Sequence, residues 1–177
     1  MKTIIIYNGI TGFTKRYAQW IAEELGSGAL PYKDFTKNII NENDIIIFGS
    51  RVHVGKVEKA NKIIPLLGNN KNLIVFATGG TPASETNTIE KIWVASLTRD
   101  EINVIPHFYF QSGMNYEKMG FADRTIMKAA ARLLDKKKNK SAEEAGFEEA
   151  IRSSHDISSR EYILPLVEFV RGKYNLG

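Results

Sequence analysis

The 177-residue chain has no cysteine, which excludes disulfide bonds, thiol catalysis and cysteine-ligated metals. Histidine is scarce too: His53, His107 and His155 are scattered, and none has a partner at metal-ligand spacing, so we expect no metal site. No apolar run approaches the roughly 18 residues that a membrane span requires. The run 4–6 is too short for the apolar core of a secretory signal. These absences predict a cytoplasmic protein.

The charge balance is mildly basic, with a formal net charge of +4 and a pI near 9.2. Such a chain suits an anionic partner or membrane surface, or it simply carries surface charge for solubility. We expect no nucleic-acid partner, and peripheral contact with a membrane stays open. The length suits a single domain over 1–177, which we expect to carry an insertion at about 111–157.

Solid apolar runs without polar alternation are typical of strands buried on both faces. Three such runs occur, at 4–7, 45–48 and 73–76. A short edge strand at 29–32 and a further strand at 102–110 complete the set, and helical patterns at 14–25, 57–67 and 84–97 separate the strands. This alternation predicts an α/β fold with a doubly wound parallel sheet, whose ligand site lies at the carboxyl ends of the strands.

The loop 8–14 joins the first buried strand to a helix. Backbone N–H groups at a helix start donate hydrogen bonds to the oxygens of a phosphate. Gly9 and Gly12 permit a tight turn, and Thr11 and Thr14 add hydroxyl groups. Neither the P-loop motif nor the G-x-G-x-x-G dinucleotide fingerprint occurs. The loop therefore predicts a phosphate site with neutral donors, and a Thr14 that merely caps the helix is the alternative.

The segment Thr11-Gly12-Phe13-Thr14 resembles the phosphate loop of flavodoxins, (S/T)-x-T-G-x-T, with Gly9 in place of the first hydroxyl residue. The resemblance implies a flavodoxin-like five-stranded parallel sheet in the order 2-1-3-4-5, with a helical insertion after the last strand. It also implies flavin mononucleotide (FMN) as the cofactor. Thr11, Gly12, Phe13 and Thr14 would then surround its phosphate.

Two later loops stand where flavodoxins line the isoalloxazine ring. The first loop comprises Ser50, Arg51, Val52, His53, Val54 and Gly55. It is similar to the loop of the flavodoxin-domain, quinone-linked protoporphyrinogen oxidases of bacteria. In those proteins an aromatic residue precedes the glycine, whereas this chain has Val54 there. The resemblance implies that His53 or Val54 covers the ring and that Gly55 offers a backbone contact to flavin N5. The second loop, at the pyrimidine end, comprises Thr78, Gly79, Gly80 and Thr81. An exposed His53 and a plain turn at 78–81 are the alternatives.

The segment 113–128 has no counterpart in flavodoxins and is similar to the insertion of that oxidase group, which is associated with its membrane quinone side. We expect Tyr116, Lys118 and Arg124 to face a substrate or partner, such as a quinone or a porphyrinogen, apart from the flavin site. Packing of the helix 121–136 on the sheet edge is the alternative.

The resemblance thus implies an FMN-dependent oxidoreductase in electron transport, of the protoporphyrinogen oxidase type. A small flavodoxin-type electron carrier is the alternative, although carriers of that kind are typically acidic. No residue is assigned a catalytic role. The sequence does not identify the electron donor or acceptor.

Overall fold

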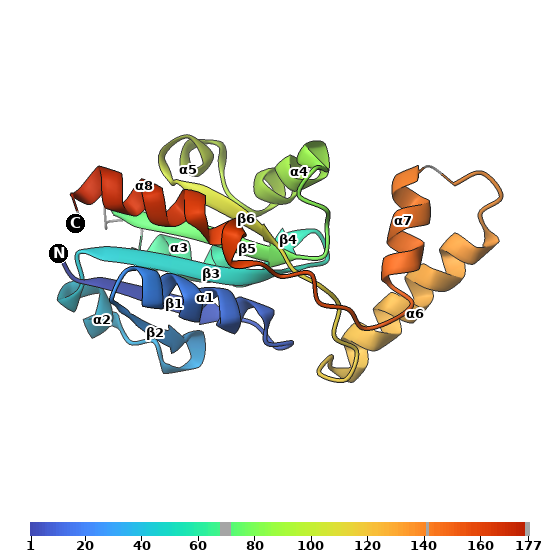
Figure 1. Cartoon of the computed structure of the whole chain (residues 1–177), viewed down its shortest axis with the longest axis horizontal. Helices are drawn as coiled ribbons and strands as arrows, with labels where there is room; N and C mark the ends of the chain where they lie inside the picture. The colour runs from blue at the N-terminus through green and yellow to red at the C-terminus, as the bar shows by residue number, and fades with distance from the viewer. Residues whose placement is uncertain (68–71, 141, 176–177) are drawn as a thin grey trace.

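The computed structural model describes residues 1–67, 72–140 and 142–175, and its centre is a parallel sheet (Figure 1). The strand order is β2-β1-β3-β5-β6, and the short β4 folds back antiparallel on the end of β3. With β4 set aside, this is the expected order 2-1-3-4-5, so the predicted fold class is confirmed. The strands are β1 (Thr3–Asn8), β2 (Gly28–Pro31), β3 (Ile45–His53), β4 (Lys56–Val57), β5 (Leu73–Gly79) and β6 (His107–Gln111).

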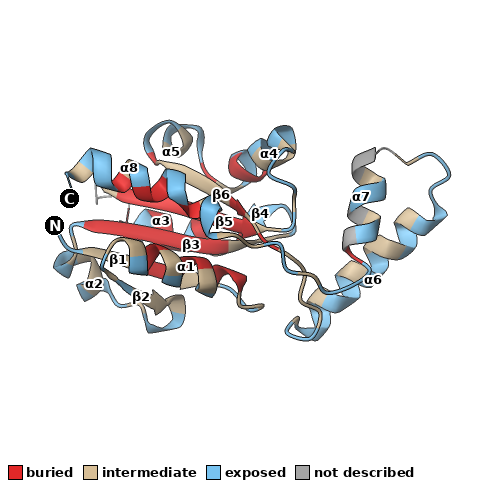
Figure 2. Cartoon of the chain, viewed as in Figure 1, coloured by how far each residue is buried: buried red, intermediate tan, exposed pale blue. Residues whose placement is uncertain are grey.

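Helices cover both faces of this sheet, and alternate strand residues point to opposite layers. Ile45 and Ile47 of β3 pack with α1 and α8, whereas Ile46 and Phe48 pack with α3 and α4. The central strands are therefore buried on both sides (Figure 2). The covering helices are α1 (Phe13–Glu24), α3 (Ala60–Leu67), α4 (Thr86–Ser96) and α8 (Leu164–Tyr174).

Parallel pairing brings the ends of the central strands to one edge of the sheet. Asn8 of β1 is paired with Ser50 of β3, and Arg51 of β3 is paired with Thr78 of β5. The three loops that the sequence singled out therefore leave the sheet side by side.

The expected strand 102–110 is wrong in its first part. Residues 99–104 form the helix α5 (Arg99–Val104), and the strand begins only at His107. A capping box starts this helix: the Thr98 hydroxyl accepts from the Glu101 N–H at 3.3 Å, and the Glu101 carboxylate accepts from the Thr98 N–H at 2.7 Å. The sequence also gave no indication of the short helices at Tyr32–Asp34 and α2 (Lys37–Glu42).

The segment after β6 forms a helical hairpin that extends away from the sheet (Figure 1). Its helices are α6 (Phe121–Lys136) and α7 (Ala142–Ala150), and the chain returns through a turn at Arg160–Ile163 to α8. No side chain of α6 is buried, and Leu133 is 72% exposed. Among the described residues, no helix has both the length and the apolar character to cross a bilayer.

Candidate functional site

The three predicted loops meet in one groove at the carboxyl ends of β1, β3 and β5. Thr11 and Phe13 come from the first loop, residues 51–55 from the second, and residues 78–81 from the third. The groove has a volume of about 400 Å³. That volume lies within the range of about 300–1,000 Å³ that is usual for small-molecule pockets. The structure thus brings together all but three of the predicted cofactor residues; Gly12, Thr14 and Ser50 do not line the groove.

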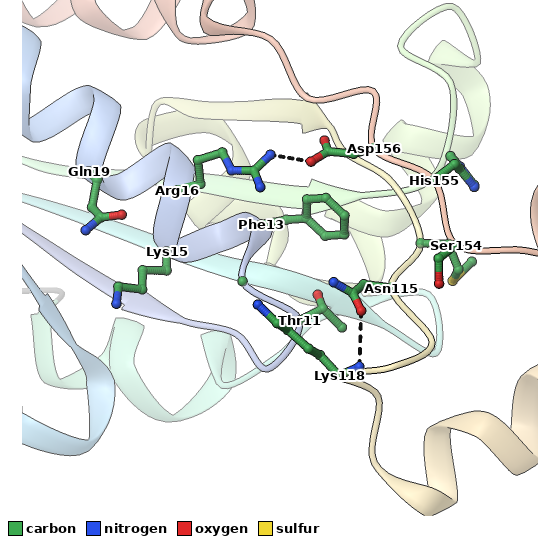
Figure 3. A pocket seen from close by; sticks show the side chains of 12 residues that line it. Thr11, Phe13, Lys15, Arg16, Gln19, Asn115, Lys118, Ser154, His155 and Asp156 are labelled. Carbon is green, nitrogen blue, oxygen red and sulfur yellow. Dashed lines mark hydrogen bonds and ion pairs between the residues drawn. The ribbon is translucent and has the colours of Figure 1, made fainter.

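A second hollow of about 530 Å³, here called the α1 hollow, lies beside the start of α1 (Figure 3). It adjoins the groove, because Thr11, Phe13, Met114 and His155 line both. Gly12 and Lys118 contribute to the α1 hollow alone. A ligand with a flat ring and a short phosphorylated chain would therefore find two connected compartments.

The turn into α1 depends on two glycines. Gly12 precedes the helix with φ of 97°, a left-handed conformation that favours glycine, and no side chain in the described chain caps the helix start. The first N–H groups of α1 therefore lack a side-chain acceptor. A Cβ on Gly9 would lie 2.6 Å from the Thr14 hydroxyl, so only glycine fits there. The arrangement is typical of a phosphate-binding turn.

The Thr14 side chain makes a contact within the protein, and its role toward a phosphate stays a prediction. Its side chain is only 2% exposed, and its hydroxyl shares a hydrogen bond of 2.7 Å with the hydroxyl of Thr78. It lies inside the first turn of α1, so it does not cap the helix. Thr14 therefore joins the first loop to the third.

The second loop contains a charged network. The Arg51 guanidinium donates to the carboxylate of Glu58 at 2.9 Å and to that of Asp123 at 2.5 Å. Burial opposes the charge of Arg51, but the two carboxylates outweigh it and raise its pKa. The hydrogen bond from Arg51 lowers the pKa of Glu58. Since Asp123 belongs to α6, this network ties the insertion to the groove.

The side chains of Asn8 and Ser50 extend this network by hydrogen bonds. Ser50 is fully buried, and its hydroxyl accepts from the Asn8 side-chain amide at 3.1 Å. The same amide donates to Glu58 at 3.0 Å. Ser50 therefore holds Asn8 within this network, and its role toward a cofactor stays a prediction.

The tip of the second loop is a two-residue turn between β3 and β4. Val54 and Gly55 have φ of 47° and 72°, as the tight hairpin requires. A β-branched residue in this region is strained, and such strain is found at functional sites. Val54 is 72% exposed at the groove, where the sequence placed a ring cover. The His53 ring lies 3.7 Å from the Asp123 carboxylate.

Tyr109 of β6, for which the sequence predicts no role at the site, holds the third loop. Its hydroxyl donates to the carbonyl of Thr81 at 2.9 Å, and burial raises its pKa to about 12. A Cβ on Gly79 would lie 2.8 Å from the same hydroxyl. Gly79 is thus needed for the close approach of Tyr109, a contact between chain segments that no local pattern reveals.

The insertion lines the groove as well, next to the three loops; that it serves a substrate or partner and not the cofactor stays a prediction. Met119, Asp123, Ile126 and Met127 form part of the groove wall. The sequence did show the amphipathic pattern of this helix, but not which surface it faces.

The three residues expected to face a substrate or partner differ in their contacts. The Tyr116 hydroxyl donates to the carbonyl of Ile151, and Arg124 donates to the carbonyls of Tyr116 and Glu117. The Lys118 side chain instead lies in the α1 hollow. Their role toward a substrate or partner stays a prediction.

The two ends of the insertion are joined by a short antiparallel β-bridge. Met114 and His155 exchange two backbone hydrogen bonds of 2.9 Å. A Cβ on Gly113 would come within 2.0 Å of the His155 carbonyl oxygen, so only glycine permits this approach.

Throughout residues 1–67, 72–140 and 142–175, no cluster of three or more acidic or histidine side chains is arranged to hold a metal ion.

A family model described as the flavodoxin domain matches residues 4–141. An uncharacterised protein of Methanocaldococcus jannaschii is 32% identical over 85 residues, which are 46% of this chain and 57% of that protein. The chain thus matches little more than half the length of that relative.

Solved structures with a similar fold include three flavoproteins. A flavodoxin of Megasphaera elsdenii in its two-electron reduced form is 13% identical (84% of this chain, 97% of that chain, TM-score 0.43). A flavoprotein of Lactobacillus acidophilus in complex with FMN is 17% identical (62% and 91%, TM-score 0.44). A flavodoxin from the domain Archaea is 17% identical (63% and 85%, TM-score 0.43).

Proposed function

The chain belongs to the flavodoxin domain family, and from this premise we propose that it binds FMN and passes electrons through it as an oxidoreductase. One observation carries the proposal: three loops that are far apart in the sequence line a single groove, which adjoins the α1 hollow. The shape suits a ring system with a phosphorylated side chain.

The residues present fit FMN in both compartments. At the start of α1, the Thr11 hydroxyl and the backbone N–H groups of Phe13 and Thr14 would hold the phosphate, in the turn that Gly9 and Gly12 make possible. The second and third loops would hold the isoalloxazine ring in the groove. Gly55 would present backbone to one edge of the ring.

Bound FMN would supply the redox chemistry, and the protein would determine its binding, potential and access. Val54 and His53 would lie over the ring from the second loop. Met119, Ile126 and Met127 of the insertion would keep water from its outer side. Arg51 is held by two carboxylates, so it would contribute shape and not a free charge.

The oxidase type is a finer part of the proposal and rests on the insertion. Its apolar groove wall suits an aromatic substrate, such as a porphyrinogen or a quinone. The lysine-rich end of α6, at 136–140, suits peripheral contact with an anionic membrane.

The alternative function is that of an electron carrier, whose partners are other redox proteins. Oxidation of a porphyrinogen with a quinone as acceptor by the FMN-loaded protein would support the oxidase, and its absence would favour the carrier.

The cofactor is tested by titrating apoprotein with FMN, FAD and riboflavin and following the quenching of flavin fluorescence. FMN should bind at least about tenfold more tightly than either of the others, a difference of about 1.4 kcal/mol. Tighter binding of FAD, or no binding of any flavin by folded protein, would contradict the proposal.

A further inference from the structure

Lys118 lies over the turn that begins α1, although it comes from the insertion. A Cβ placed on Gly12 would lie 3.8 Å from the Lys118 ammonium nitrogen. Figure 3 shows the extended side chain with its amino end near Thr11. Lys15 lines the same hollow, but in this view its amino end points away from Lys118. The positive charge of Lys118 thus stands beside the first N–H groups of α1.

This ammonium is free to meet an anion. Arg16, the arginine of the same hollow, is paired with Asp156 and also donates to the Ser158 hydroxyl at 2.8 Å. Lys118, in contrast, makes no side-chain hydrogen bond or ion pair with any residue that the structure describes. A free lysine beside unfilled N–H groups favours a ligand with negative charge.

The loop that carries Lys118 is held in place by its own contacts. Arg124 donates to the carbonyls of Tyr116 at 2.8 Å and Glu117 at 3.1 Å, the two residues before the lysine. The Lys118 N–H donates to the Asn115 side-chain oxygen at 3.1 Å.

Ser154, on the returning chain, ties down the same loop. Its hydroxyl accepts from the Tyr116 N–H at 2.9 Å and donates to the Glu117 carboxylate at 2.8 Å. The backbone of Lys118 is therefore positioned before any ligand arrives, and ordering it costs little on binding.

We infer that Lys118 completes the phosphate site: its ammonium pairs with the terminal phosphate of FMN, so the insertion takes part in cofactor recognition. The inference rests on the proposed function. The sequence predicted neutral donors alone at this phosphate, because no lysine is positioned as in a P-loop. The fold supplies one from more than a hundred residues away. Lys118 would thereby favour FMN over riboflavin, which has the same ring and no phosphate.

The test compares FMN and riboflavin binding by calorimetry for the wild type, Lys118→Ala and Lys118→Arg. Lys37→Ala is the matched control, because it removes one exposed lysine from α2, at the opposite end of the sheet (Figure 1). Lys118→Ala should raise the Kd for FMN at least tenfold and leave the Kd for riboflavin within about twofold. Lys118→Arg should restore most of the FMN affinity, and Lys37→Ala should change neither Kd. The salt dependence of FMN binding should also weaken in Lys118→Ala.

Two results with folded Lys118→Ala would overturn the inference. An unchanged Kd for FMN would show that the lysine does not meet the phosphate. An equal loss for FMN and riboflavin would show that it shapes the ring site instead. Failure of the wild type to bind FMN would be a different result, since it would refute the proposed function itself.

Discussion

The central sheet and the α6–α7 hairpin are held by different forces. The first six residues of β3 and of β5 are all buried, and helices cover them on both faces. α6 buries no side chain, and the hairpin is joined by ion pairs, such as those of Arg152 with Asp135 and Glu148. Hydrophobic burial contributes most to stability, whereas exposed ion pairs contribute little. The sheet should therefore determine global stability, and the hairpin should open locally at lower cost.

The largest expected effect contrasts one apolar residue from each region. Ile47→Ala in β3 removes a fully buried side chain and should lower the free energy of unfolding by about 2–5 kcal/mol. Leu133→Ala in α6 removes a side chain that is 72% exposed and should change it by less than about 0.5 kcal/mol. Urea unfolding followed by circular dichroism measures both. A comparable loss in Leu133→Ala would mean that the hairpin packs against something in solution.

The sheet was predictable for the same reason that it is stable. Strands buried on both faces read as solid apolar runs, so β1, β3 and β5 were located from sequence, and the turn at Gly12 was recognised from its neighbouring threonines. The helix α5 was missed because Ile102, Val104 and Ile105 are apolar residues that suit a strand, and the capping box at Thr98 was overlooked.

The groove was only partly predictable. Its three loops each follow a strand, and parallel pairing brings strand ends together, so local patterns were enough to find them. The placements of Tyr109, Asp123 and Lys118 depend on contacts between distant segments. No periodicity records such contacts, and a single sequence therefore does not place these residues beside the groove.

A smaller effect is expected at the joint between the two regions. Asp123→Ala removes the carboxylate that accepts from Arg51, while Glu58 still holds the guanidinium. Hydrogen bonds to charged groups contribute about 1.5–3 kcal/mol, so the amides of α6 should exchange at least about tenfold faster. The amides of β3 and β5 should keep their rates.

Hydrogen exchange measured by mass spectrometry would test this local opening. Asp34→Ala, at an exposed carboxylate beside β2, is the matched control and should leave α6 unchanged. Faster exchange in the sheet as well would show that the hairpin and the sheet unfold as one unit. Unchanged exchange in α6 would show that Arg51 does not anchor it.

The smallest effect concerns acid, at Glu58 in the same network. The hydrogen bond from Arg51 holds the pKa of Glu58 below its usual value of 4.5, against the opposing effect of burial. Because the folded-state pKa is the lower one, the contribution of this carboxylate to stability is fully present above pH 4.5 and is lost as the pH falls through the folded-state pKa. Glu58→Gln should therefore make the free energy of unfolding fall less steeply below pH 4.5.

Urea titrations from about pH 6 down to about pH 3 would measure this slope. Glu90→Gln, at an exposed glutamate on α4, is the control and should keep the wild-type slope. An acid slope in Glu58→Gln equal to that of the wild type would mean that Arg51 is held mainly by Asp123, so that the anchor belongs to the hairpin and not to the sheet.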